Sequence, residues 1–346
     1  MNSSERAHKF RETFPLSLTK SIKDSRIEVK RVLICRPNHR LGNLLLITPL
    51  IQEITEIFPD CKIDLFVKGG IAPILFKNYE NIHRIIQLPK RPLLHLLGSV
   101  KAGISIRKHR YDLVIDVDKK SSSGRLSTGF ANSKHKISGD EIESIKSKFP
   151  NYAHHAKFPV YNFRHYLSEM GYPQQDGPIP PLNLKLNSLE IAKGKVLLDQ
   201  LVRNERPTIC LFTFATGDKC YSEIWWENFY ERLQTEFPLH NIIEVLPVQN
   251  VSKLSFKAPT FYSKDVREIA SLIANTEVFI GADSGIMHLA SAAQTPTVGL
   301  FSITDQSLYA PYNENSVAIN TNLIDTDRCM HVLHNILQDK YIHQPI

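Results

Sequence analysis

Short apolar runs alternate along the chain with longer segments whose apolar residues recur at helical spacing. In the first half, the apolar runs predict strands at 31–36, 62–67, 83–88 and 111–117. Helical spacing follows the first run, at Ile47, Leu50, Ile51, Ile54, Ile57 and Phe58, and it returns near 71–77 and over 93–109. Strands that alternate with helices in this way are typical of a parallel α/β sheet.

The same alternation restarts in the second half. It predicts strands at 207–215 and 241–248, with a helix over 224–237 between them. The passage 264–302 then reads as a helix capped by Asp265, the strand TEVFIG, the turn ADSG, the helix IMHLASAA and the strand TPTVGLFS. An amphipathic helix over 327–341 ends the pattern.

The middle of the chain separates these two units. Residues 119–141 are polar and Ser-rich and predict a mobile loop with one short helix, whereas 154–171 regains helical spacing. The Pro-rich stretch YPQQDGPIPPLNLKL predicts a linker, with the boundary near 175–205. We therefore expect an N-terminal arm over 1–28, a first domain over 29–180 and a second over 181–346, whose terminal helix could cross back to the first domain.

Composition agrees with a globular protein: of 346 residues, 42% are hydrophobic and 22% are charged. No apolar run approaches the roughly 18 to 20 residues of a spanning helix. The first 25 residues lack the apolar core of a secretory signal, so we interpret them as a cytoplasmic arm. The five cysteines show neither metal-ligand spacing nor a disulfide framework, which fits a reducing compartment.

Charge is divided unevenly between the two halves. Residues 1–180 hold 29 Lys and Arg against 17 Asp and Glu, a net of +12, whereas 181–346 hold 13 against 18, a net of −5. A basic half suits nucleic acid, an anionic membrane surface or a phosphorylated substrate. The chain has no aromatic-interleaved basic motif, zinc finger or recognition-helix pattern, so we expect no nucleic-acid partner.

The turn ADSG is the first candidate site. It delivers Asp283, Ser284 and Gly285 to the start of a helix, where unpaired N–H groups and the helix dipole attract an anion. Gly285 allows a phosphate to approach the backbone, and His288 follows on the same side of the first turns. The alternative is that Asp283 or Ser284 only caps the helix.

Two motifs carry a resemblance to a known family. The passage GADSGIMHLASAAQTPTVGLFSITDQSLYAPY resembles the D-[ST]-G-x-x-H-L-A-A-A signature of glycosyltransferase family nine, the heptosyltransferases, and the stretch RPNHRLGNLLLITPL, which contains Gly42, resembles their R-x-x-x-x-G-D-x-x-x-x-T-P-L motif. The resemblance implies the GT-B fold, with two Rossmann-like parallel-sheet domains facing a cleft. It also implies inverting, metal-independent transfer of a sugar, heptose by preference, from a nucleoside-diphosphate donor such as ADP-heptose.

The resemblance also implies roles for individual residues. Asp283, Ser284, Gly285 and His288 would lie in the donor site, together with Thr216 of the stretch FATGDKCYSEIWW. Lys219 of that stretch matches a family lysine, and a cation there would neutralise the departing nucleoside diphosphate. The alternative for Lys219 is an exposed loop lysine. No cofactor or metal is expected beyond the nucleotide sugar.

One position departs from the family motif. Where the family has an aspartate, thought to deprotonate the acceptor hydroxyl, this chain has Asn43, and an amide cannot take a proton at neutral pH. Asp116 or Asp118, at the end of a predicted strand, could replace it, and so could His39. A third explanation is a protein that binds its sugar nucleotide and transfers slowly or not at all.

The acceptor is expected to be anionic. Basic residues lie in loops expected near the cleft of the first domain, namely Arg36, Arg40, Lys68, Lys119, Lys120 and Arg125. With Gly42 and His39, such residues would bind a phosphorylated glycolipid or oligosaccharide of the lipopolysaccharide type. The family implies a cytoplasmic enzyme at the periphery of the inner membrane. The rival functions are a non-catalytic nucleotide-sugar binder and a sugar-nucleotide epimerase of related fold, which would need carboxylates that the first motif lacks.

Overall fold

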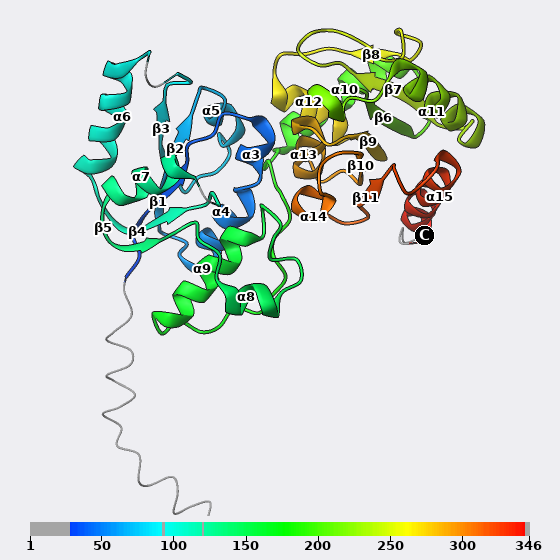
Figure 1. Cartoon of the computed structure of the whole chain (residues 1–346). Helices are drawn as coiled ribbons and strands as arrows, with labels where there is room; N and C mark the ends of the chain where they lie inside the picture. Colours follow the sequence, from blue (N-terminus) through cyan, green and yellow to red (C-terminus); the bar gives the residue numbers. More distant parts are fainter. Residues whose placement is uncertain (1–27, 92–93, 120, 343–346) are drawn as a thin grey trace, which may run out of the picture.

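Two parallel sheets stand side by side in the computed structural model, which describes residues 28–91, 94–119 and 121–342 (Figure 1). The strands of the first sheet are β1 (Arg31–Arg36), β2 (Lys62–Lys68), β3 (Ile82–Leu88), β4 (Arg110–Asp116) and β5 (Asn132–Ile137). Those of the second are β6 (Thr208–Phe212), β7 (Asn241–Val245), β8 (Thr260–Phe261), β9 (Val278–Ala282), β10 (Thr297–Phe301) and β11 (Val317–Asn320). The predicted N-terminal arm, 1–28, falls almost wholly outside the described residues.

Helices cover both faces of each sheet. Those of the first half are α3 (Leu41–Leu45), α4 (Thr48–Ile57), α5 (Ala72–Leu75), α6 (Leu96–Lys108), α7 (Ser122–Phe130), α8 (Glu143–Lys148) and α9 (Phe158–Glu169). Those of the second are α10 (Ser188–Val202), α11 (Glu223–Glu236), α12 (Val266–Ile273), α13 (Gly285–Ala292), α14 (Gln306–Tyr309) and α15 (Thr326–Ile342). None of the helices in the described part of the chain is long and apolar enough to cross a membrane.

The strand order places one topological switch point in each sheet. The orders are β3-β2-β1-β4-β5 and β11-β10-β9-β6-β7-β8, with every pair parallel. The direction of winding reverses between β1 and β4 and again between β6 and β9. Ligands of open α/β sheets bind beside the carboxyl ends of strands at such a reversal, so these four strand ends are where chemistry is expected.

Alternating side chains of the strands build separate cores on the two faces. In β1, Val32 and Ile34 face the core that includes residues of α4 and α9, whereas Leu33 and Cys35 face a smaller core to which α6 contributes. In the second sheet, α12 and α13 cover one face, and α11 and α15 cover the other. The loops at the switch points therefore start from strands buried on both faces.

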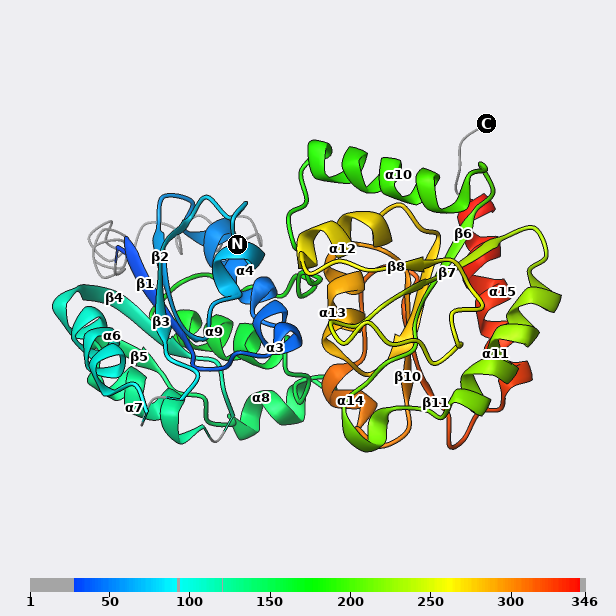
Figure 2. The ribbon, with the colours of Figure 1, turned by 90° about the horizontal axis from the view of Figure 1, so that it is seen from above.

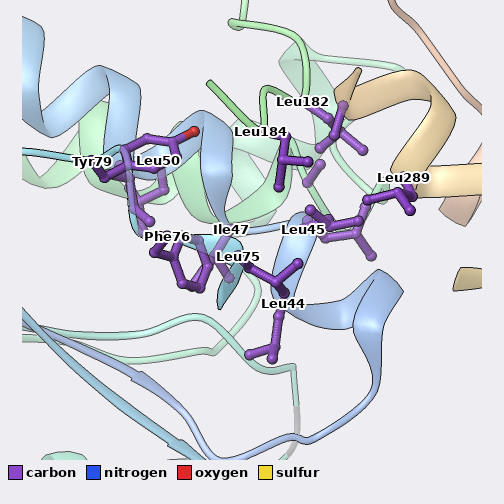
Figure 3. Close-up of a cluster of buried hydrophobic side chains, with 14 of the residues drawn as sticks. Leu44, Leu45, Ile47, Leu50, Leu75, Phe76, Tyr79, Leu182, Leu184 and Leu289 are labelled. Carbon is purple, nitrogen blue, oxygen red and sulfur yellow. The ribbon is translucent and has the colours of Figure 1, made fainter. Parts of the chain in front are cut away.

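The junction between the domains is an apolar core rather than an open hinge. Buried apolar side chains from three parts of the chain meet here (Figure 3). The first domain contributes Leu44, Leu45, Ile47, Leu50, Leu75, Phe76 and Tyr79, the linker contributes Leu182 and Leu184, and α13 contributes Leu289. These residues belong to one continuous cluster of buried side chains. The two sheets are therefore joined by packing as well as by chain connectivity.

A buried arginine crosses the same junction. Arg267 of α12 is 3% exposed, and its guanidinium donates to both carboxylate oxygens of Glu190 in α10, at 2.6 and 2.9 Å. It also donates to the carbonyl oxygens of Leu75, in α5 of the first domain, at 3.1 Å, and of Leu184, in the linker, at 3.2 Å. A single guanidinium thus joins α12 both to α5 of the first domain and to the segment that runs from Leu184 to Glu190.

The structure differs from the predicted elements in three places. Residues 119–141 contain the short helix that was predicted there, α7, but also the edge strand β5 where only a mobile loop was expected. Helix α15 packs against α11, with an Arg232–Asp327 ion pair of 2.9 Å, and does not cross back to the first domain within the described residues (Figure 2). The segment before the predicted helix is also helical: α3 begins at Leu41, and α4 follows it with Ile47 as its N-cap residue.

Candidate functional site

The turn between β9 and α13 exposes the start of a helix to a cavity. Ser284 is extended, with φ −153° and ψ 170°, and its Oγ accepts a hydrogen bond from the Met287 N–H at 3.2 Å, so the capping role is real. The N–H groups of Gly285 and Ile286 have no acceptor among the described residues, and both residues line the cavity. An anion placed there would satisfy these two donors.

Lys219 and Asp283 come together beside this helix start. Lys219 ends η1 (Gly217–Lys219), a short 3-10 turn after β6, and its Nζ lies 2.9 Å from Asp283 Oδ2. The carboxylate is buried, whereas the lysine side chain is 34% exposed. Asp283 therefore orients a cation that still faces solvent at the β6/β9 switch point.

The two glycines of the sequence motifs meet across the domain junction. A Cβ atom built on Gly42 would lie 2.7 Å from His288 Cδ2 and 3.4 Å from Gly285 Cα. A Cβ atom built on Gly285 would lie 3.3 Å from the Gly42 nitrogen. Because side chains at either position would separate α3 from α13, glycine permits this close approach.

His288 is a buried, neutral imidazole at this contact. It is 4% exposed, and burial lowers its pKa to about 4 although the Asp283 carboxylate acts in the opposite direction. The ring of Tyr309, at the end of α14, lies with its centroid 6.1 Å away. At neutral pH the imidazole can offer one N–H donor and carries no charge.

Arg36 organises the β1/β4 switch point of the first domain. It is 4% exposed, and burial lowers its pKa to about 10, which leaves it charged at neutral pH. Its Nε donates to the Asn43 backbone oxygen at 3.2 Å, and its guanidinium forms an ion pair with Asp118. A single side chain therefore links the backbone of Asn43 to a partly exposed carboxylate of the β4 strand end.

Asp116 lies behind this pair. Its Oδ1 accepts the Asp118 backbone N–H at 3.1 Å, and its buried Oδ2 has no hydrogen-bond partner among the described residues. Burial raises its pKa to about 7, whereas Arg36 and Arg125 act to lower it. A Cβ atom on Gly124 of α7 would collide with the carboxylate, so the start of α7 closes over it.

A cavity of about 510 Å³ lies between the domains and reaches the start of α13. The first domain contributes Leu41, Ile71 and Lys90 to its lining. The second contributes Thr216 and the loops after β6, β7 and β8, with Phe214, Leu246, Pro247 and Lys264 among them. The mixture of apolar walls and a few polar groups, at this volume, is typical of a small-molecule site.

Comparison with known proteins identifies the family. A family model described as glycosyltransferase family 9 (heptosyltransferase) matches residues 263–334. Lipopolysaccharide heptosyltransferase 3 of Escherichia coli is 24% identical over an alignment of 312 residues that covers 80% of this chain and 85% of that protein. The chain resembles glycosyltransferase family 9. The resemblance stated from the two motifs is confirmed, and the protein is a glycosyltransferase.

Solved structures confirm the GT-B fold of this glycosyltransferase. A family 9 glycosyl transferase from Veillonella parvula aligns with a TM-score of 0.72 at 13% identity, over 91% of this chain and 99% of that one. The Escherichia coli heptosyltransferase WaaC, solved with ADP-2-deoxy-2-fluoro heptose, aligns with a TM-score of 0.60 at 16% identity, over 90% and 99%.

Some predicted acceptor residues of the glycosyltransferase are exposed or are bonded within the first domain. His39 and Arg40 are exposed, and partial burial together with Lys68, Lys90 and Arg40 lowers the pKa of His39. Lys119 donates to Glu141 Oε1 at 3.3 Å and to the Ala153 oxygen at 3.1 Å. Lys120 lies outside the described residues.

Other residues near the site were missed by sequence reasoning. Tyr309 stacks on His155 of the first domain with ring centroids 4.6 Å apart, and the Leu308 oxygen accepts the His155 N–H at 3.0 Å. Tyr309 lies within the passage that resembles the family signature, but nothing in the sequence indicated that it contacts His155. Lys264 and Lys90 carried no sequence signal, because isolated loop lysines are common. No group of three metal-ligating side chains occurs within the described chain.

Proposed function

We propose that this glycosyltransferase transfers heptose from ADP-heptose to an acceptor of the lipopolysaccharide type. The observation that carries the proposal is the contact between Gly42 and Gly285, which joins both motifs at the opening of one cavity. The relatives support the choice of substrates: one is named a lipopolysaccharide heptosyltransferase, and WaaC was solved with an ADP-heptose analogue.

In the proposed donor complex, the diphosphate lies at the start of α13. The Gly285 and Ile286 N–H groups and the Lys219 ammonium would bind its oxygens, with Thr216 at the edge of the cavity. The nucleoside would occupy the apolar part near Phe214, Leu246 and Pro247. Lys219 and the helix start would then neutralise the departing ADP in a metal-independent reaction.

For the missing carboxylate at Asn43, we propose Asp118 as the base. Arg36 bonds both the Asn43 backbone and Asp118, and the Asp118 side chain is 18% exposed, whereas Asp116 is sealed behind it. In this inverting step the acceptor oxygen attacks the anomeric carbon, its proton passes to Asp118, and the bond from that carbon to the phosphate oxygen breaks. Asp116 is then a positioning residue that fixes the Asp118 backbone.

A transfer assay tests the base. Each variant would be assayed with ADP-heptose and a heptose-deficient lipopolysaccharide acceptor. We expect Asp118→Asn to lower kcat by about 10² to 10⁴ with ADP binding retained, because general-base catalysis contributes about this much. His39→Gln and Asp116→Asn should lower it less. Undiminished turnover in Asp118→Asn would exclude the assignment, and no turnover of the wild type with any nucleotide sugar would favour the non-catalytic binder.

ADP binding tests the donor site separately. In calorimetric titration, the affinity of Lys219→Ala for ADP should be at least tenfold lower than that of the wild type, because a charge-assisted bond to phosphate is lost. Lys257→Ala is the matched control, because Lys257 of the same domain pairs with Glu227 at 2.8 Å on the surface. Equal ADP affinities for these two variants would contradict the proposed place of the diphosphate.

We also propose that the acceptor is anionic and presented at the inner face of the cytoplasmic membrane. Arg40 on the exposed loop after β1, and Lys90 at the cavity, supply positive charge on the first-domain side. Such charges attract phosphorylated sugars and anionic lipid alike.

A further inference from the structure

Helix α6 carries its large apolar residues on the outside of the protein. Leu97 is 89% exposed, and Val100 and Ile104, three and seven residues later, are each 59% exposed. This spacing places the three side chains in one stripe along the helix. The preceding Leu94 and Leu96 are 69% and 63% exposed.

The inner face of α6 explains why these residues are not in the core. The smaller first-domain core receives only Ala102 and Ile106 from this helix. A Cβ atom on Gly98 would lie 2.9 Å from the Pro89 side chain, so the inner face needs small residues. The helix thus packs closely through small residues while its bulky ones face outward, the reverse of an ordinary surface helix.

Helix α7 extends the same surface. Leu126 and Phe130, four residues apart, are 75% and 47% exposed. The two helices contact each other, and a Cβ atom on Gly103 of α6 would touch the Phe130 ring at 3.8 Å. Both helices lie at the edge of the first domain away from the second sheet (Figure 2). We call Leu97, Val100, Ile104, Leu126 and Phe130 the outer apolar surface.

The two helices of the outer apolar surface carry charges of one sign. Neither α6 nor α7 contains Asp or Glu, whereas Lys101, Arg107 and Lys108 are exposed on α6. The Arg107 guanidinium lies 5.5 Å from the Phe130 ring centroid and donates to the Phe130 oxygen at 3.2 Å. An apolar stripe beside Lys and Arg is the pattern of a helix that lies in a bilayer interface.

We propose that the outer apolar surface docks the protein on an anionic lipid bilayer. The apolar side chains enter the interface between headgroups and acyl chains, and the flanking Lys and Arg bind lipid phosphates. A second copy of the chain is the poorer occupant, because a symmetric contact would oppose Lys101, Arg107 and Lys108 to themselves without any acidic partner on either helix. A 13-residue helix offers roughly 20 Å of contact along its axis.

The location links this surface to the proposed acceptor and so rests on the proposed function. Helix α7 begins against Asp116, at the β1/β4 switch point, and runs outward to Phe130. A bilayer in contact with α6 and α7 therefore lies beside the first-domain edge of the site. A lipid-borne acceptor would reach the site from the membrane without leaving it.

Vesicle flotation tests the docking surface. Wild type is mixed with vesicles of phosphatidylglycerol and phosphatidylethanolamine, or of phosphatidylcholine alone, with no nucleotide present. We expect binding to the anionic vesicles only, weakened by 0.5 M salt, and at least tenfold weaker for Leu97→Ser/Ile104→Ser. The matched control is Leu189→Ser/Val196→Ser on α10, whose side chains are 62% and 55% exposed.

A second readout reports insertion directly. The native tryptophans, Trp225 and Trp226, lie on α11 of the second domain. Brominated lipid should quench the added fluorescence of Leu97→Trp and leave that of Leu189→Trp unchanged. The proposal would be overturned by equal quenching of the two tryptophan variants or by equal flotation of the two double variants. It would also be overturned if the wild type were a dimer that Leu97→Ser/Ile104→Ser dissociates.

Transfer assays separate this inference from the proposed function. Leu97→Ser/Ile104→Ser should retain wild-type turnover with a detergent-dispersed acceptor and lose at least tenfold with the same acceptor in vesicles. Loss with both acceptors would overturn the docking role. Absence of turnover in wild type, with vesicle binding intact, would reject the proposed reaction and leave the docking surface standing.

Discussion

Asn43 is the residue at which the chain departs from its family, and its surroundings suggest how activity is kept. Its backbone oxygen accepts from Arg36, which is also paired with Asp118. A positive side chain therefore stands between the family's base position and a neighbouring carboxylate. The carboxylate that pairs with Arg36 is that of Asp118, which follows the end of a different strand, β4.

A rescue experiment follows from this arrangement. Asn43→Asp in an Asp118→Asn background should restore transfer at least tenfold over Asp118→Asn alone, because a carboxylate returns beside Arg36. The measurement is kcat with ADP-heptose and acceptor. Asn43→Leu in the same background is the control and should restore nothing. Equal rates for the two double variants would argue against a carboxylate at this place.

The glycine contact predicts a second residue effect. Gly42→Ala places a Cβ 2.7 Å from the His288 ring, which is fixed by burial, so we expect a loss of about 1–3 kcal/mol in unfolding free energy and weaker ADP binding. Denaturant unfolding and ADP titration measure both. Gly70→Ala is the control, since a Cβ there meets nothing within 4 Å. Unchanged stability and ADP affinity in Gly42→Ala would show that α3 and α13 can separate freely.

At the scale of elements, the helices α5, α10 and α12 are held together by Arg267. Arg267→Met should remove roughly 1.5–3 kcal/mol of stability, because Glu190 would lose its bidentate partner and keep the ion pair with Lys77 at 2.9 Å. Chemical denaturation gives the value. Lys195→Ala, which breaks an exposed pair with Asp199 on α10, should change stability by under about 0.5 kcal/mol. A similar loss in both variants would mean that the Arg267 contacts add little.

The sequence predicted those elements whose side chains are buried on both faces, and it did not predict elements with few buried side chains. Strands β1, β4 and β9 read clearly because both faces are buried. Strand β5 has the polar sequence NSKHKI at a sheet edge, and α7 is rich in Ser and Gly, so neither offers an apolar pattern. Helix α3 is short and depends on its contact with α13, which local sequence cannot reveal.

The sequence predicted those residues of the candidate site that follow the ends of strands. Gly42, Lys219 and Asp283 were singled out, and the structure brings them to the two switch points. The wall of the cavity was not predicted, because Phe214, Leu246 and Lys264 come from three loops whose side chains meet only in the folded chain. Tyr309 was also missed, since its partner His155 belongs to the other domain.

At the scale of the whole molecule, three buried or half-buried histidines of the described chain lie at the domain junction. Burial lowers the pKa of His154 to about 3, and those of His155 and His288 to about 4. The unfolded chain would bind protons at these sites near its ordinary pKa of 6.5, so their neutral forms stabilise the fold above pH 6.5 and lose this effect as pH falls toward 4. Asp116, with its raised pKa, acts in the opposite direction.

We therefore expect acid to weaken the junction. The Tm should fall by about 5 °C or more between pH 7 and pH 5, as three lowered histidines outweigh one raised aspartate. His155→Phe keeps a ring against Tyr309 without a titrating group, so its Tm should fall less over the same range. His83→Gln, at an exposed position of β3, should follow wild type. Identical pH profiles for His155→Phe and wild type would exclude the junction as the cause.

The continuous core across the junction also determines where the chain can be cut. Residues 203–206 form an exposed connection between α10 and β6, whereas α10 itself packs against α12 and is held to it through Glu190 and Arg267. Two fragments divided in this connection would each expose half of the shared core, and each would present the other with a complementary surface. The protein is thus suited to fragment complementation, in which sugar transfer returns only when both pieces are made in the same cell.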